Sequence, residues 1–386
     1  MSSKQKYNWK RFLFDIHLWL GLGSGIIVSI LCLTGFYLAF HPTVEEWINR
    51  KANHRIETTA LPSVSDFLGM VQTDSEDTYT AIQIPTDLKM AWVLREGRRS
   101  TLFEPATGVQ LKEPQPFLDG SYRFCFRLHR WLLLERSAGR TITGAATVVF
   151  LVTLMSGVIL WVQKTAKNRK RGLWFKKGVG WKRLNYDTHL ILGLYASIPL
   201  FVMGFTGLFW SYRTPFVTTV YRVLDGTSPP APQERKEEGQ QRLTVYDLPY
   251  ETVRAYFAER FPEPGTLTIY FPKDGDKTFR ATKRRDAGFG RLPVTDEVFF
   301  SVQDGDVKEE KFFSEKSRAQ KFLSLVKAIH LGEFYGLFST IIYLLCTAIG
   351  TTIPISGTIM WWNRIKWRFR RGSRKPIDPV TPRSLR

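Results

Sequence analysis

Residues 15–40 read DIHLWLGLGSGIIVSILCLTGFYLAF, and residues 187–212 read DTHLILGLYASIPLFVMGFTGLFWSY. A constant offset of 172 residues superimposes the two stretches. The aligned positions are Asp15 with Asp187, His17 with His189, Gly21 with Gly193, and Thr34 and Gly35 with Thr206 and Gly207. A match of this length at a fixed offset indicates an internal repeat, which has to be recognised before any fold is inferred.

A second pair of apolar stretches repeats as well. Residues 141–162 end in SGVILWV and residues 334–362 end in SGTIMWW. The shared positions are Ser156 with Ser356, Gly157 with Gly357 and Trp161 with Trp361. A histidine precedes each stretch, His129 in the first half and His330 in the second. The chain is therefore a tandem duplication in which four histidines recur.

Four uncharged runs are long enough to cross a membrane as helices. They occupy residues 18–40, 141–162, 190–212 and 334–362, and a hydrocarbon core requires about 20 apolar residues. Lys, Arg and Trp flank these runs, which favours membrane helices over buried helices of a soluble protein. The first run is longer than a signal-peptide core and lacks a small-residue cleavage pattern, so we expect it to be retained as an anchor.

The net charge of +20 is concentrated at one set of helix ends. Residues 1–15, 163–188 and 363–386 hold 22 basic residues and only three acids, Asp15, Asp187 and Asp378. The rest of the chain is nearly neutral, with 33 basic and 32 acidic residues. This is the positive-inside pattern, which predicts that both termini and the central basic loop are cytoplasmic. A nucleic-acid partner is not expected, because the excess charge is explained by membrane topology.

These runs and charges predict the order of segments along the chain. In sequence we expect a cytoplasmic leader (1–14), a first membrane helix (15–40), a first outer domain (41–140), a second helix (141–162), a basic cytoplasmic loop (163–188), a third helix (189–212), a second outer domain (213–333), a fourth helix (334–362) and a basic cytoplasmic tail (363–386). The predicted fold class is an α-helical membrane protein with four transmembrane helices, arranged as a tandem two-helix repeat.

Each outer segment has the pattern of a small α+β domain. The first shows a helix over residues 62–72 and strands over 79–84, 90–95 and 100–103. The second shows a helix over 245–261 and strands over 267–271, 278–282 and 297–303, the last leading into a turn at 304–306. Alternating apolar residues bounded by Gly, Pro and Asp mark these strands. The order helix, strand, strand, strand thus occurs twice.

These features together resemble the PepSY-associated transmembrane family. The resemblance rests on the outer modules, on D-x-H-L-x-L-G-L and T-G in the odd helices, and on S-G-x-I-x-W in the even helices, and it covers nearly the whole chain. The family includes bacterial inner-membrane ferric-siderophore reductases of the ferrioxamine-reductase type, which carry b-type haem. The resemblance implies a PepSY-like periplasmic domain in each repeat, and ferric-siderophore reduction at the bacterial inner membrane.

The histidines support haem binding independently of that resemblance. The first and third helices run in the same direction, so the two halves are related by an axis along the membrane normal. His17 and His189 are then expected to meet near the cytoplasmic surface, and His129 and His330 near the outer surface. Two facing imidazoles are a ligand set of b-type haem, so we predict two bis-histidine haems. The small residues that would admit a macrocycle are Gly21, Gly23, Gly25 and Gly193.

Simpler interpretations remain open for each of these residues. A histidine at a helix end can be hydrated at the interface, and small residues also serve helix packing. The recurrence of His17 and His189, with Asp15 and Asp187 two residues earlier as orienting partners, favours ligation. A helix break at Ala138 and Gly139 would lay residues 124–134 along the membrane surface. His41 has Arg213 as its repeat counterpart, and either an interfacial role or a ligand role is open to it.

The sequence therefore predicts a transmembrane electron conductor. Electrons would pass from the cytoplasmic histidine pair to the outer pair and reduce a ferric siderophore held by the outer domains. Arg123, Arg127, Arg130 and Lys327 are candidates to hold haem propionates or an anionic acceptor. No dinucleotide or phosphate-loop motif is present, so the donor is expected to be a separate reductase or reduced flavin. Cys32, Cys125 and Cys346 lack the spacing of a zinc site or a covalent haem attachment.

Two alternatives from other classes are kept. A haem-free membrane sensor or protease regulator would suit the outer modules, which resemble domains associated with peptidase inhibition, but it gives no reason for matched histidines. A transporter would suit the duplication and the prolines inside equivalent helices, Pro199 and Pro354. Four helices are a thin scaffold for alternating access.

Overall fold

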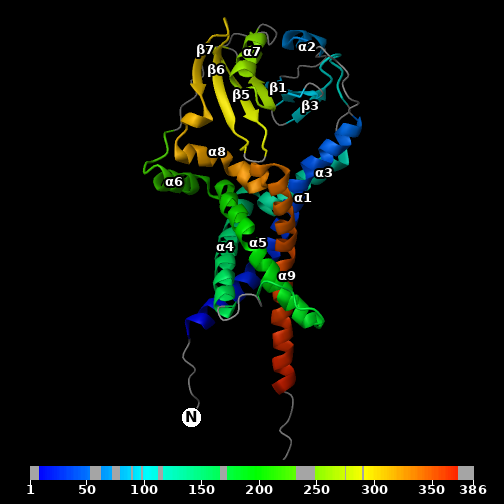
Figure 1. Cartoon of the computed structure of the whole chain (residues 1–386), viewed down its shortest axis with the longest axis vertical. Helices are drawn as coiled ribbons and strands as arrows, with labels where there is room; N and C mark the ends of the chain where they lie inside the picture. The colour runs from blue at the N-terminus through cyan, green and yellow to red at the C-terminus, as the bar shows by residue number, and fades with distance from the viewer. Residues whose placement is uncertain are drawn as a thin grey trace, which may run out of the picture.

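The computed structural model describes residues 8–52, 62–71, 79–87, 90–96, 99–111, 116–165, 172–231, 248–273, 275–288 and 291–372. A bundle of long helices carries a β-sheet domain at one end, and short helices lie between the two parts (Figure 1). The first helix begins, and the last helix ends, at the opposite end of the bundle from the sheet. We call these two ends the terminal side and the sheet side.

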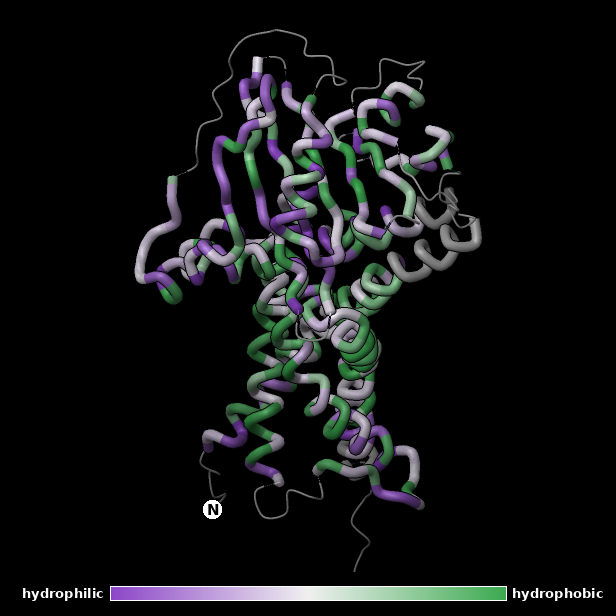
Figure 2. The backbone as a smooth tube through the Cα atoms, turned by 45° about the horizontal axis from the view of Figure 1, so that its top comes forward, coloured by the Kyte–Doolittle hydropathy of each residue, from purple (hydrophilic) through white to green (hydrophobic). Residues whose placement is uncertain are grey.

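Four helices in the described part of the chain are long and apolar enough to cross a membrane. They are α1 (Trp9–Ala52), α4 (Arg136–Thr165), α5 (Trp181–Ser211) and α9 (Leu337–Gly372). Many of their apolar side chains are exposed, such as Ile26 at 78% and Ile198 at 75%. In water such exposure would be costly, whereas acyl chains accept it. The hydrophobic colour of the bundle contrasts with the mixed colour of the sheet domain (Figure 2). The chain is thus a multi-pass membrane protein.

The helices extend beyond the apolar runs from which they were predicted. Helix α1 begins at Trp9 and α5 at Trp181, so basic residues at the terminal side continue the helices rather than ending them. Charged side chains are compatible with helical backbone once it leaves the hydrocarbon region, because their ends reach water. Within the bundle, α1 packs against α4 and α9, and α5 packs against the same two helices. The helices of the two repeats are thus interleaved.

The two outer segments form one sheet. Its strand order is β3-β2-β1-β4-β5-β6-β7. The strands are β1 (Ala81–Pro85), β2 (Trp92–Glu96), β3 (Arg99–Phe103), β4 (Gly265–Tyr270), β5 (Thr278–Arg285), β6 (Thr295–Ser301) and β7 (Val307–Lys311). Strand β1 pairs antiparallel with β4, from Ala81 opposite Tyr270 to Pro85 opposite Thr266. The first and second repeats are therefore joined edge to edge by main-chain hydrogen bonds, which covers an edge strand of each module.

A shared core holds this sheet to two helices, α2 (Val64–Met70) and α7 (Tyr250–Arg260). Phe67 of α2 and Phe257 of α7 are buried in the same cluster as Trp92 and Phe300 of the sheet. The predicted order of one helix followed by three strands is confirmed in both segments. Strand β7 was not predicted, because its sequence VKEEK is charged at nearly every position.

Three further helices lie at the junction between sheet and bundle (Figure 1). They are α3 (Pro116–Trp131), α6 (Arg213–Leu224) and α8 (Arg318–Leu331). Helix α3 packs on α1 and α4, and α8 packs on α5 and α6. A capping box at Ser317 and Gln320 begins α8, since each side chain bonds the backbone N–H of the other residue. Helix α3 carries His129 and α8 carries His330 to the sheet side of the bundle.

Candidate functional site

The four recurring histidines meet as two pairs. The ring centroids of His17 and His189 lie 6.2 Å apart, with ring planes at 86°. Those of His129 and His330 lie 6.5 Å apart, with planes at 63°. Thr34, which contacts His129, follows His17 by about 25 Å along helix α1 at 1.5 Å per residue. One pair therefore lies toward each end of the bundle, and we call them the terminal-side pair and the sheet-side pair.

Each ring of the terminal-side pair is held by the second long helix of its own repeat. In both rings Nδ1 lies beside a backbone carbonyl and a serine hydroxyl. The distances are 3.0 Å from His17 to the Thr153 carbonyl and 3.2 Å to Ser156 Oγ, and 3.1 Å from His189 to the Ile353 carbonyl and 2.8 Å to Ser356 Oγ. The two repeats thus hold this histidine in the same way.

Each ring of the sheet-side pair is held by the first long helix of its own repeat. His330 Nδ1 lies 2.9 Å from the Met203 carbonyl and 3.2 Å from Thr206 Oγ1. His129 Nδ1 lies 3.0 Å from Thr34 Oγ1, and the ring also bonds the backbone of Leu31. In all four cases the carbonyl stands three residues before the Ser or Thr. The same arrangement of a backbone carbonyl and a side-chain hydroxyl therefore holds every histidine ring.

The hydrogen bond at Nδ1 determines which ring nitrogen is free to bind a ligand. A carbonyl oxygen only accepts hydrogen bonds, so Nδ1 must carry the proton that it donates. The neutral ring then keeps its lone pair on Nε2. A metal-binding histidine commonly donates its other N–H to a carbonyl in this manner, which fixes the ring and raises its basicity. Each pair thus offers two oriented Nε2 donors.

A glycine lies against each of the four rings. A Cβ atom added to Gly157 would lie 2.9 Å from His17 Cε1, which is closer than atoms tolerate. At the other three glycines the added Cβ would lie 3.2 Å from the Cε1 of the neighbouring ring, and the pairs are Gly357 with His189, Gly35 with His129 and Gly207 with His330. Each glycine directly follows the Ser or Thr that contacts Nδ1. The T-G and S-G dipeptides therefore supply a hydroxyl and the space for an imidazole.

The surroundings keep the sheet-side imidazoles neutral. Loss of hydration on burial, together with the neighbouring His330, lowers the pKa of His129 to about 4. Burial likewise lowers the pKa of His330 to about 4. Arg130 is half-buried beside His129, and burial together with the nearby Arg140 lowers the pKa of its guanidinium. A neutral imidazole has the lone pair that a metal ion needs.

A break in the helix precedes α4 and another precedes α9, but the two differ. Leu132 and Leu133 have φ of 52° and 61° between α3 and α4. Gly332, with φ of 75°, ends α8 and is followed by a short 3₁₀ turn over Glu333–Tyr335. The break predicted at Ala138 and Gly139 is therefore wrong in position, since both residues lie inside α4. Gly139 instead allows α4 to pack closely against the end of α3, because a Cβ at residue 139 would lie 2.3 Å from the Trp131 carbonyl oxygen.

The predicted orienting role of the aspartates is also wrong. Among the described residues, neither His17 nor His189 is hydrogen-bonded to an aspartate. Asp187 instead forms a salt bridge of 2.8 Å with Arg183 one turn earlier, and its side chain is only 3% exposed. Arg183, in the first turn of α5, thus pairs with the Asp187 carboxylate. The contact to His189 that was expected from the aspartate is made by the Ser356 hydroxyl instead.

Other glycines proposed from the sequence do not border the rings. A Cβ on Gly23 would meet nothing within 4 Å, and on Gly21 it would touch Thr153 at 3.5 Å. Gly25 lies against Pro354 and Gly193 against Ile353, both on α9. These four glycines therefore line helix contacts or open faces of the bundle.

The predicted basic residues lie on α3 and α8. Arg123, Arg127 and Lys327 are exposed, whereas Arg130 is half-buried. The Arg130 guanidinium lies 5.7 Å from the ring centroids of Phe126 and Trp131. Of the four, Arg130 is therefore the residue fixed beside the sheet-side pair.

His41 is buried at the sheet-side end of the membrane part of α1. Its ring centroid lies 4.7 Å from that of Tyr122 and 5.8 Å from that of Tyr37. Phe126 continues this aromatic row along α3, with its ring centroid 6.2 Å from that of Tyr122. His41 thus packs among the aromatic rings of Tyr37 and Tyr122.

Sequence reasoning missed the roles of the residues that hold the rings. Thr34, Thr206, Ser156 and Ser356 were noted only as marks of the repeat, although all four are buried. The signal that would have identified them is a hydroxyl residue followed by glycine, repeated once for each histidine. Among the described residues there is no group of three or more His, Cys, Asp or Glu side chains that could hold a bare metal ion.

The donor set matches a haem better than a bare ion. A first-row metal lies about 2 Å from a coordinating imidazole nitrogen, so two rings on opposite sides of one iron have centroids about 6 Å apart. The measured 6.2 and 6.5 Å agree with this spacing. Two nitrogen ligands alone leave the other positions of an iron ion to be filled, which a porphyrin does.

The comparison with known proteins bears on the whole chain. No curated protein matches it. The family model described as the PepSY-associated TM region matches residues 14–364, which include the sheet, the four histidines and the greater part of each spanning helix. The chain therefore belongs to the family of the PepSY-associated transmembrane region.

Proposed function

We propose that this protein is a transmembrane electron-transfer protein that binds two b-type haems and reduces ferric siderophores. The observation that carries the proposal is the fourfold repetition of one histidine setting, with ring centroids 6.2 and 6.5 Å apart. His17 and His189 would hold one haem, and His129 and His330 the other. When bound, each haem supplies reversible one-electron chemistry at its iron.

The residues of the chain orient and insulate this chemistry. Ser156, Ser356, Thr34 and Thr206 fix the rings through Nδ1, so the imidazoles need not reorganise when a charge arrives. The four adjacent glycines bring helix backbone against the rings. The surrounding bundle excludes water and lowers the local dielectric, which together with the ligands tunes a redox potential. The protein would thus determine the position of each haem, its redox potential and its access to water.

The direction of transfer follows from the charge distribution. The helix ends at the terminal side carry the basic segments, which are expected to be cytoplasmic. The sheet then lies on the outer face, in the periplasm of a bacterial inner membrane. Electrons would enter from a cytoplasmic donor, a reductase or reduced flavin, and would leave at the sheet-side pair.

The acceptor is proposed from the chemistry of iron chelation. Hydroxamate-type siderophores bind ferric iron through hard oxygen donors, which suit the softer ferrous ion less well. One-electron reduction would loosen the complex and release iron. Arg130, half-buried beside His129, would hold a haem propionate or an anionic part of the acceptor, a role that its partial burial supports.

Proteoliposomes test this function. Purified protein is reconstituted with dithionite trapped inside, and a ferric hydroxamate complex and a chromogenic ferrous chelator are added outside. The expected result is ferrous iron formed outside by the native protein, and none by a His17→Ala, His330→Ala double variant. A native protein that forms ferrous iron no faster than the double variant or empty liposomes containing the same reductant would be without this function. A colourless protein from haem-replete cells would favour the haem-free sensor or regulator.

A further inference from the structure

A cation contacts an aromatic ring one helical turn before each histidine of the terminal-side pair. Lys164 Nζ lies 4.4 Å from the ring centroid of Tyr186 and donates a hydrogen bond to its hydroxyl. Arg364 Cζ lies 5.4 Å from the ring centroid of Phe14. Tyr186 and Phe14 each precede a histidine of that pair by three residues. Residues three apart share a helix face, so each ring lies on the face that carries the histidine.

This contact recurs at both offsets of the duplication. The offset of 172 residues aligns Phe14 with Tyr186. The offset of 200 residues, which aligns the S-G dipeptides of α4 and α9, aligns Lys164 with Arg364. The positive-inside pattern requires basic residues near these helix ends but no particular partner for them. A cation that recurs over the equivalent ring therefore indicates a role linked to the duplicated histidines.

The direction of the helices brings both cations toward the histidines. Helices α4 and α9 run from the sheet side to the terminal side (Figure 1), and helical side chains lean toward the N-terminus of their helix. Lys164 follows Gly157, the residue against the His17 ring, by seven residues or about 10 Å along α4. Arg364 stands in the same relation to Gly357. The two cations thus lie on the terminal side of the two imidazoles, one from each repeat.

Neither cation is paired with an acidic side chain in the described part of the chain. Lys164 and Arg364 form no ion pair there, although Arg183 and Asp187 form one of 2.8 Å at the same end of the bundle. Both cations are exposed. A carboxylate or phosphate that reached them would form charge-assisted hydrogen bonds, which are stronger than those between neutral groups.

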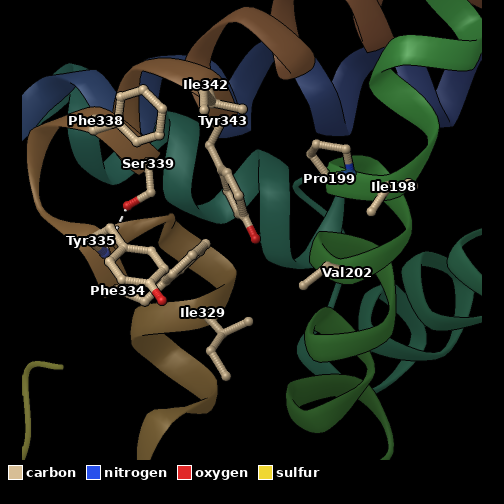
Figure 3. Close-up of a pocket in the computed structure, with 10 residues that line it drawn as sticks. All are labelled: Ile198, Pro199, Val202, Ile329, Phe334, Tyr335, Phe338, Ser339, Ile342 and Tyr343. Carbon is tan, nitrogen blue, oxygen red and sulfur yellow. Dashed lines mark hydrogen bonds between the residues drawn. The ribbon is translucent and has the colours of Figure 1, made fainter. Parts of the chain in front are cut away.

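The apolar pocket on the sheet side has no comparable charge. It lies between α5, α8 and α9 and is lined by side chains such as Ile198, Val202 and Phe338 (Figure 3). Among the described residues that line it, none is charged. An anionic group placed there would lose its hydration without gaining a partner. An anion is therefore expected at the two cations of the terminal side rather than in this pocket.

We propose that Lys164 and Arg364 bind the two propionate groups of a haem held by His17 and His189. The inference rests on the haem function proposed above, and it assigns the orientation of that haem, with its propionates toward the basic side of the membrane. One cation from each repeat matches a macrocycle that carries two carboxylates. Lipid phosphate is another anion at such a surface, but it does not account for a cation beside both histidines.

Haem dimethyl ester tests the assignment, because it has the macrocycle of haem without the charged carboxylates. Full-length protein from haem-deficient cells is reconstituted in nanodiscs of neutral lipid with either compound, and release into excess apomyoglobin is followed. The terminal-side component is identified by its absence from His17→Ala. The native chain should release the ester about fivefold faster than haem, since each exposed ion pair contributes little. The Lys164→Gln, Arg364→Gln double variant should release both at the same rate.

A second pair of lysines provides the matched control. Lys176→Gln, Lys177→Gln removes two exposed positive charges from the segment between α4 and α5, at the same end of the bundle. This variant should keep the native preference for haem over the ester. The sheet-side component should keep its release rates in all three proteins, which checks that each variant is folded.

The reduction potential gives a second readout. A positive charge beside the macrocycle favours the addition of an electron. The Lys164→Gln, Arg364→Gln variant should therefore have a lower midpoint potential at its terminal-side haem and an unchanged potential at its sheet-side haem. Equal potentials in this variant and in the native protein would contradict the placement of the two cations.

The outcomes separate this inference from the haem function. A chain that takes up neither compound would overturn both. Haem uptake with equal release of haem and ester by the native chain, or an undiminished preference in the double variant, would overturn this inference alone. If the double variant released both compounds equally faster than the native chain, and only in nanodiscs of anionic lipid, the cations would be assigned to lipid phosphate instead.

Discussion

The four histidines have the same hydrogen-bonding surroundings, but the two pairs lie on different kinds of helix. His17 and His189 lie within α1 and α5, and each of these helices continues on both sides of its histidine. His129 and His330 lie near the ends of α3 and α8, which stop before the spans α4 and α9 begin. The terminal-side pair is therefore positioned by helix packing alone, whereas the sheet-side pair also depends on the two helix breaks. The sheet-side pair should be the more sensitive to changes at loops.

The largest effect is expected from filling the space beside one ring. Gly157→Val places a side chain where even a Cβ lies 2.9 Å from His17 Cε1, so the ring must move and the terminal-side haem should be lost. Haem per chain should fall by half, measured by extraction and absorption, while the sheet-side haem remains. Gly23→Val is the control, since nothing lies within 4 Å of a Cβ there. Equal haem content in both variants would contradict the role given to Gly157.

The break before α9 provides the next test. Gly332→Ala combines a φ of 75° with a Cβ only 2.6 Å from Tyr343 Cγ, so it should displace α8 and weaken the sheet-side pair. Gly226→Ala shares the positive φ, 69°, but has open space around the added atom. Backbone strain alone costs about 1–2 kcal/mol. Gly332→Ala should lower the unfolding temperature further than Gly226→Ala and remove sheet-side haem; an identical loss of stability with haem retained would mean that packing at Gly332 is unimportant.

Smaller effects are expected from the hydroxyls that contact Nδ1. Ser356→Ala should weaken the terminal-side haem alone and Thr206→Val the sheet-side haem alone, each by about tenfold, as for other groups that orient metal-bound histidines. Haem transfer to apomyoglobin measures the loss rate of each group. Thr352→Ala is the control, because in the described part of the chain the Thr352 hydroxyl bonds the Ile349 carbonyl of its own helix and no other group. If either variant weakens both haems equally, the assignment of one haem to each histidine pair is contradicted.

The smallest effect concerns the break before α4. Leu133 has φ of 61°, which costs a leucine about 1 kcal/mol and an asparagine less. Leu133→Asn should therefore raise the free energy of unfolding by up to about 1 kcal/mol relative to Leu134→Asn, which loses a similarly exposed leucine outside the left-handed region. Denaturant unfolding compares the two proteins. A less stable Leu133→Asn would show that the leucine is retained at this break for its apolar contacts.

The spans and the pairing of the histidines could be predicted because both follow from long, repeated patterns. Apolar runs identify spanning helices, and duplication with conserved direction brings copies of one residue together across an axis. The hydrogen-bond partners of the histidines could not be predicted, because they lie on another helix, as Ser156 does for His17. The junction of β1 with β4 was also beyond the sequence, since strand order across two segments distant in the chain depends on tertiary packing.

The helix break shows a different limit of sequence patterns. Ala138 and Gly139 have the residue types of a break, yet the chain turns at Leu132 and Leu133, which have ordinary helix formers' side chains. Packing of Gly139 on the Trp131 carbonyl outweighs local propensity there. The roles of the basic residues likewise depend on which face of α3 is buried, and only Arg130 lies on the buried side.

Haem counting by pyridine haemochrome, with spectra before and after dithionite, tests the central claim most directly. The measurement compares the native protein with His17→Ala, His189→Ala, His129→Ala and His330→Ala. The account predicts two low-spin b-type haems in the native chain, loss of one common spectral component in the first two variants, and loss of the other in the last two. A native protein without haem, or single-histidine variants that keep both components, would contradict it.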